Sequence, residues 1–143
     1  MRRALALTLA AAALSAAGCG DDTPPISTLC TQSEATVSRA LARAPGPVVL
    51  ADGTRLSDCV ANANDAAELQ NFGVVATRVA DALAERGDAV RLGYLIGAAE
   101  RGAAHGEGVP LELVHRLSVS ARRLPAGHDA ELERGRRAGT RTG

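Results

Sequence analysis

The chain has 143 residues, and its 16 basic side chains, all arginine, are balanced by 16 acidic ones. The length supports one domain, while the zero net charge, single Phe, single Tyr and absent Trp exclude the basic, aromatic surface of a nucleic-acid-binding protein. No stretch of roughly 20 apolar residues occurs beyond the N-terminus, so the sequence predicts no internal membrane span.

Residues 1–18 have the layout of a secretory signal peptide. Two arginines follow Met1, and an uncharged stretch rich in Ala and Leu continues to Ala17. The run Ala16–Cys19 resembles the lipobox of bacterial lipoproteins, with Ala16 at a position where that motif usually has Leu. The resemblance covers only this N-terminal part. It implies cleavage before Cys19 and attachment of a diacylglyceryl group to its thiol, with acyl chains of the palmitate type.

The cysteine count agrees with this interpretation. The chain has three cysteines, and an odd number in a secreted protein calls for an explanation. If Cys19 carries lipid, Cys30 and Cys59 remain as a pair that we expect to form a disulfide in an oxidising compartment. Two acyl chains suffice for stable anchoring, which predicts a protein on the extracytoplasmic face of the cell membrane. The alternative is ordinary cleavage near Ala17, which would release a soluble protein.

The first part of the mature chain is predicted to join the membrane to a fold. Residues 19–28 form the lipidated N-terminus and a polar tether, whose eight or so linking residues reach at most ~28 Å. A capping-box pattern at Thr31 and Glu34 predicts a helix that continues to about Ala44, where a Pro-Gly-Pro run ends it. An Asp-Gly pair between short apolar runs predicts a β-hairpin at about 48–56. An irregular loop with one tight turn is the alternative.

The middle of the chain carries the clearest helical periodicity. A capping-box pattern begins at Asp65, with Asn64 as the alternative cap, and apolar residues recur every three or four positions from Leu69 to Leu83. This predicts an amphipathic helix of about twenty residues that ends before Gly87. Asp88 is predicted to cap the next helix, whose apolar stripe continues as far as Ala103.

That second helix contains two glycines four residues apart, Gly93 and Gly97. Their spacing favours the close approach of a neighbouring helix to a surface without side chains. The alternative is a groove lined by Ala and Gly that accepts a small apolar molecule. Gly93 and Gly97 mark the position of this candidate groove.

The last part of the chain is predicted to hold one more helix and a tail. Pro110 suits the first turn of a helix that ends before Pro125. Residues 126–143 are predicted to form a short helix followed by a flexible basic tail, whose four arginines are also candidates for contact with anionic headgroups. The helical domain is thus residues 29–125. The predicted fold is all-α, a small bundle of about four helices with one short hairpin and a Cys30–Cys59 disulfide.

The sequence contains no convincing catalytic or metal-binding pattern. Glu112 and His115 form one E-x-x-H pair, whereas a di-iron carboxylate bundle needs two such pairs and two further Glu, for which only Glu68 and Glu100 stand out. The three histidines are scattered, so we predict no metal, no cofactor and no catalytic residue.

These observations predict a membrane-anchored extracytoplasmic lipoprotein that acts as a non-catalytic binding or structural module. Its partners would be the membrane, through the N-terminal lipid, and another envelope protein, with no role for nucleic acid. The alternatives are a secreted small-molecule carrier that uses an inter-helix groove and, less favoured, an enzyme with a Glu/His site.

Overall fold

A computed structural model describes residues 25–143, and within them the chain forms seven helices and no β-strand. The helices are α1 (Thr28–Gln32), α2 (Glu34–Leu41), α3 (Asp58–Ala61), α4 (Ala66–Glu85), α5 (Ala89–Gly102), α6 (Val109–Ala121) and α7 (Asp129–Thr142). The all-α expectation is confirmed.

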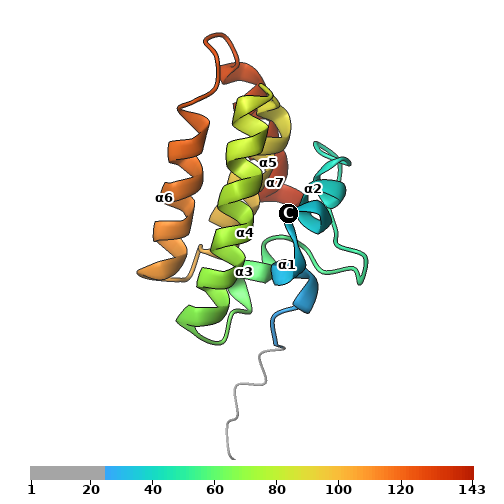
Figure 1. Cartoon of the computed structure of the whole chain (residues 1–143), viewed down its shortest axis with the longest axis vertical. Helices are drawn as coiled ribbons and strands as arrows, with labels where there is room; N and C mark the ends of the chain where they lie inside the picture. The colour runs from blue at the N-terminus through green and yellow to red at the C-terminus, as the bar shows by residue number, and fades with distance from the viewer. Residues whose placement is uncertain (1–24) are drawn as a thin grey trace, which may run out of the picture.

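The four long helices α4 to α7 form an up-and-down bundle around α5 (Figure 1). Residues 92–99 of α5 are all buried, because α4, α6 and α7 pack against different sides of this helix and α2 and α3 also touch it. Successive helices reverse direction, so α4 is parallel to α6 and α5 is parallel to α7 (Figure 1). The short helices α1 to α3 cover one flank of the bundle.

The predicted starts of α4 and α5 are confirmed. The Asp65 carboxylate accepts a hydrogen bond from the Glu68 amide at 2.8 Å, and Asp88 accepts one from the Arg91 amide at 3.4 Å. Each bond satisfies one of the backbone N–H groups that a helix leaves open at its N-terminus. The twenty-residue length of α4 agrees with its apolar periodicity, and Phe72 is buried in the core.

The N-terminal helix differs from the expectation, because two short helices replace the one predicted from Thr31 to Ala44. Ser33 separates them with an extended backbone, and its hydroxyl oxygen accepts a hydrogen bond from the Thr36 amide at 3.2 Å. Thr31 is inside α1, where its hydroxyl donates to the Thr28 carbonyl at 3.4 Å. The predicted capping box of Thr31 and Glu34 was therefore wrong, and Ser33 is the cap of α2.

The predicted β-hairpin at 48–56 is also wrong. Val49 and Arg55 form a single antiparallel bridge around a tight turn, in which Gly53 has a φ of +88°. This bridge does not extend into a ladder, because the Val48 amide donates to the hydroxyl of Tyr94 on α5 instead of to the facing chain segment. The alternative, an irregular loop with one tight turn, describes this segment.

The disulfide between Cys30 and Cys59 is confirmed, and it joins α1 to α3. Both cysteines are completely buried. The bridge therefore fixes the N-terminal flank to the segment that precedes α4. Cys19 and the predicted signal peptide, residues 1–18, lie outside the described residues, as do residues 19–24 of the predicted tether.

The C-terminal segment is not the short helix and flexible tail that we expected for residues 126–143. It forms the fourteen-residue helix α7, in which Gly135, Ala138 and Gly139 are buried. The Ser57 hydroxyl donates to the Gly143 carbonyl at 2.7 Å, which fixes the end of α7 beside the N-cap of α3. The segment is ordered in the fold because its glycines pack against α5.

Candidate functional site

Helices α5 and α7 pack with their backbones in contact, through two glycines on each helix. A Cβ added to Gly93 would overlap the backbone of Leu132, and one added to Gly97 would overlap that of Arg136. The same holds in reverse for Gly135 and Gly139, which lie against the backbone of α5. Pairs of small residues four apart allow such close approach.

The close helix approach predicted from Gly93 and Gly97 is therefore present, and α7 is the neighbouring helix. The surface over these two glycines is filled by the α7 backbone. It is not an open groove, so the candidate ligand groove does not lie at this position.

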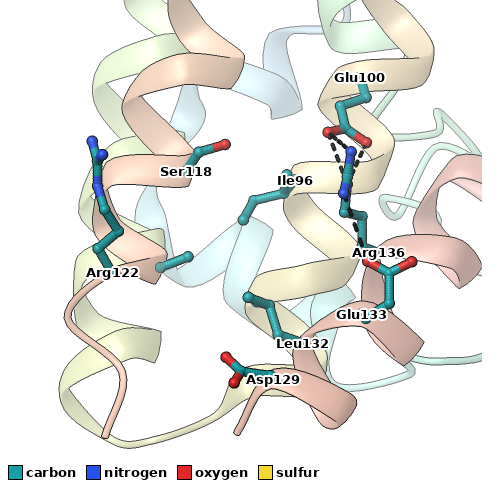
Figure 2. Close-up of a pocket in the computed structure, with 9 residues that line it drawn as sticks. Ile96, Glu100, Ser118, Arg122, Asp129, Leu132, Glu133 and Arg136 are labelled. Atoms are coloured by element: carbon teal, nitrogen blue, oxygen red, sulfur yellow. Dashed lines mark hydrogen bonds and ion pairs between the residues drawn. The ribbon is translucent and has the colours of Figure 1, made fainter. Parts of the chain in front are cut away.

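An open groove lies next to this interface, between α6 and α7. Its volume is about 540 Å³, and α5 forms its floor (Figure 2). Because the glycines place α7 directly on α5, α7 makes little contact with α6, and a gap remains between these two helices. Ile96 is the residue before Gly97 on α5, and its side chain lies at the bottom of the gap.

The groove combines an apolar floor with charged edges. Ile96, Ala121 and Leu132 supply the apolar surface, one residue from each of the three helices. The polar lining residues come mainly from α5 and α7, with two from the α6 side: Glu100, Ser118, Arg122, Asp129, Glu133 and Arg136. Many small-molecule sites have this composition, an apolar cleft of about 300–1,000 Å³ with a few polar groups.

One edge of the groove is an ion-pair cluster centred on Arg136. Its Nε atom donates to both carboxylate oxygens of Glu100 at 2.9 Å, and another guanidinium nitrogen lies 3.6 Å from Glu133 (Figure 2). The hydrogen bond to Glu100 and the charge of its carboxylate raise the pKa of Arg136, and Glu133 adds to this effect. The cluster links α7 to α5 and keeps these three side chains engaged with one another.

The opposite edge is formed by the end of α6. The Ser118 hydroxyl donates to the Val114 carbonyl of its own helix at 2.9 Å, which leaves its oxygen lone pairs for a ligand. The Arg122 side chain extends away from the Glu100–Arg136 cluster (Figure 2). The charged side chains of the groove therefore lie mainly on the α7 side, where Arg136 is paired with Glu100 and Glu133, and the α6 side contributes only Arg122.

The Glu/His constellation considered from the sequence is not assembled. Glu112 and His115 are exposed on α6, and Glu112 lies 3.8 Å from Arg116. Glu68 accepts a hydrogen bond from the Asn64 amide at the start of α4, and Glu100 is bonded to Arg136. Residues 25–143 contain no group of three or more His, Cys, Asp or Glu side chains placed to hold a metal ion.

The remaining histidines also lie apart. His105 is exposed in the loop after α5, and His128 pairs with Glu131 at the start of α7, with 2.9 Å between Nδ1 and Oε2.

None of the helices in the described part of the chain has both the length and the apolar character to span a bilayer.

Comparisons of the chain with protein-family models, curated proteins and solved structures find no match. The groove must therefore be interpreted from its own residues. The sequence did not indicate it, because residues 126–143 were predicted to form a short helix and a flexible tail instead of one long packed helix. The signal that could have found it is the second glycine pair, Gly135 and Gly139, which repeats the spacing of Gly93 and Gly97.

Proposed function

We propose that this chain is a lipid-anchored extracytoplasmic lipoprotein whose helical domain is a non-catalytic binding module. The groove between α6 and α7 is its binding surface. The observation that carries the proposal is the combination of an apolar lining, made by Ile96, Ala121 and Leu132, with charged edges in one open cleft of about 540 Å³. The partner class is an envelope protein that inserts an apolar segment into the cleft.

The anchor part of the proposal rests on cysteine pairing. Cys30 and Cys59 are bonded to each other, which leaves Cys19 as the third cysteine. A disulfide with both sulfurs buried supports a chain that folds in an oxidising compartment. The lipobox-like run that ends at Cys19 supports lipidation of its thiol, and the diacylglyceryl group would supply the two chains that stable anchoring needs.

The binding part of the proposal rests on how the polar groups at the groove are engaged. Arg136 is bonded to Glu100 and paired with Glu133, so these charges already satisfy one another. Such a pre-formed edge suits orientation of a ligand, because its side chains need no rearrangement on binding.

A second candidate function, a carrier of a small apolar molecule, is favoured by the groove volume. About 540 Å³ lies within the range of small-molecule sites, and the floor is apolar. The two functions differ in what occupies the cleft, a segment of a protein or a free small molecule.

Intact mass measurement of the protein extracted from its host's membranes tests the anchor. We expect the mass of residues 19–143 plus a diacylglyceryl group, with two thiols that react only after reduction. A soluble chain that lacks lipid and has a reactive Cys19 would contradict the proposed anchor.

Site-specific photocrosslinking in the host cell tests the groove. A photoreactive amino acid replaces Ala121, in the part of the groove lining that α6 supplies, and the matched control carries it at Ala67, an exposed alanine on α4. We expect a protein adduct of one defined mass from position 121 only. A small-molecule adduct at 121 would favour the carrier, and identical adducts at both positions would contradict a binding role for the groove.

A further inference from the structure

Helix α7 carries a row of arginines on its exposed surface, and its glycines face α5. Arg134, Arg137 and Arg141 recur at spacings of three and four residues, which places them along one side of the helix. Together they line a surface hollow of about 310 Å³. Residues 134–143 include no acidic side chain.

These guanidinium groups are accessible to a ligand. The Arg137 side chain is 69% exposed although its Nε lies 3.1 Å from Glu133. Among residues 25–143, neither Arg134 nor Arg141 has a carboxylate within ion-pairing distance. Each planar guanidinium can donate two parallel hydrogen bonds to a phosphate group, which makes arginine suited to phosphate recognition.

The row is held on a rigid support. The Thr142 hydroxyl lies 2.9 Å from the Tyr94 hydroxyl, and Ser57 donates to the Gly143 carbonyl at 2.7 Å. Arg101 of α5 donates to the Arg141 carbonyl. These bonds fix the backbone at the C-terminal end of α7, which carries Arg137 and Arg141, unlike the flexible tail that the sequence suggested.

The Arg141 end of the row lies on the same side of the fold as the start of the described chain. Ser57 bonds the end of α7, and Cys59, two residues later, is bonded to Cys30 of α1. Cys30 follows Cys19 by eleven residues. A membrane attached at Cys19 is thus within reach of the arginine row.

We propose that the Arg134, Arg137 and Arg141 row docks α7 onto the phosphate groups of anionic phospholipids in the membrane to which the chain is anchored. This inference rests on the proposed lipid anchor. The anchor makes the second contact intramolecular, with an effective concentration on the order of millimolar, so that a few arginines suffice to hold the domain on the surface. Docking would fix the orientation of the α6–α7 groove relative to the bilayer.

The test uses the full mature protein, reconstituted in vesicles of phosphatidylcholine alone or with phosphatidylglycerol. A dye is attached to a cysteine introduced by Ala130→Cys, at an exposed site on α7 one turn before Arg134, and a quencher is carried by the lipid. The matched control is Ala67→Cys on α4, which Figure 1 shows in front of α5 and α7. We expect at least twofold stronger quenching at position 130 in vesicles with phosphatidylglycerol, and no such change at position 67.

Charge removal identifies the groups responsible. The variant Arg134→Gln/Arg137→Gln/Arg141→Gln is expected to lose the extra quenching, whereas a triple Arg→Gln variant at three exposed arginines elsewhere is expected to keep it. That control changes the net charge equally; its sites are Arg43, Arg55 and Arg86. About 1 M salt, where the screening length falls to ~3 Å, should also abolish the extra quenching.

Two outcomes would overturn the inference: equal quenching at position 130 in both lipids, or extra quenching that persists in the Arg134, Arg137 and Arg141 variant. A competition experiment adds soluble glycerophosphate or an acidic peptide, at a phosphate or carboxylate concentration equal to that of the lipid phosphate. If either removes the extra quenching, the inference is also overturned, because the arginine row would then bind a soluble anion. Co-sedimentation with pure phosphatidylcholine vesicles tests the lipid anchor independently of the arginine row, because a chain without the anchor would not sediment with them.

Discussion

Gly97 of α5 lies against the backbone of Arg136 of α7, so close that a Cβ at position 97 would overlap the Arg136 carbonyl oxygen. The same Arg136 sends its side chain back to Glu100, one turn further along α5, at 2.9 Å. One residue of α7 thus contributes its backbone to the glycine interface and its side chain to the edge of the groove. The position of the groove therefore depends on the glycines.

A Gly97→Ala variant is expected to be less stable by about 1–3 kcal/mol, because the added methyl group overpacks a backbone contact that cannot yield. Gly73→Ala is the matched control, since Gly73 is also buried in a helix and a Cβ there would meet only side-chain atoms, at 3.5 Å or more. We expect the control to be neutral or more stable by up to ~1 kcal/mol, the gain in helix propensity. Urea unfolding of both variants measures the difference. Equal stability of the two would contradict rigid glycine packing.

The sequence predicted the helices whose signals are local. Asp65 and Asp88 cap α4 and α5, where a polar side chain and an apolar period coincide. It failed where a distant group takes over the local hydrogen bonds, as the Tyr94 hydroxyl does with the Val48 amide. A hairpin signal cannot report a partner 46 residues away.

The candidate site was predicted only in part, for a related reason. Gly93 and Gly97 indicated a close neighbour, but nothing near them in the sequence identifies α7 as that neighbour. The segment from Arg134 onward has the composition of a solvated tail. It is helical because Gly135 and Gly139 gain backbone contact with α5, a tertiary effect.

Reduction of the Cys30–Cys59 disulfide is expected to lower the melting temperature by roughly 10 °C. The bridge spans 29 residues of chain, and closing a loop of that length contributes about 3–4 kcal/mol in the chain-entropy model. Calorimetry with and without reductant measures the shift. The Cys30→Ala/Cys59→Ala variant is the control, because reductant should not change its melting temperature. A shift below about 3 °C would show that the disulfide contributes little.

The Asp52 carboxyl is expected to titrate below its ordinary value of 3.8. The Ser27 hydroxyl and then the Thr54 amide donate hydrogen bonds to it and lower the pKa of Asp52. Since the folded-state pKa is depressed, the stabilisation is complete above the unfolded-state pKa and is lost as the pH falls through the folded-state value. A ¹³C NMR titration of the carboxylate measures this midpoint.

A Ser27→Ala variant should raise the midpoint of Asp52, because the larger of the two causes is removed. Ser38→Ala on α2 is the control, since the Ser38 side chain has no hydrogen bond to Asp52, and it should leave the midpoint unchanged. A wild-type midpoint at or above 3.8 would contradict the assigned hydrogen bonds.

A Tyr94→Phe variant is expected to be less stable by about 1–3 kcal/mol. The Tyr94 hydroxyl accepts from the Val48 amide at 3.0 Å, so its removal leaves a buried N–H group without a partner. Thr142→Val is the matched comparison, because it removes the 2.9 Å bond between Tyr94 and α7, together with the Thr142 bond to the Ala138 carbonyl of its own helix, and leaves the Val48 bond in place. The Thr142→Val variant should lose about 1 kcal/mol of stability or less.

Urea unfolding measures the loss of stability of both variants. Faster hydrogen exchange of the Val48 amide in the Tyr94→Phe variant alone would assign the larger loss to the bond between Val48 and Tyr94. If Thr142→Val destabilises the protein as much as Tyr94→Phe, the end of α7 rather than the 48–56 loop depends most on this hydroxyl.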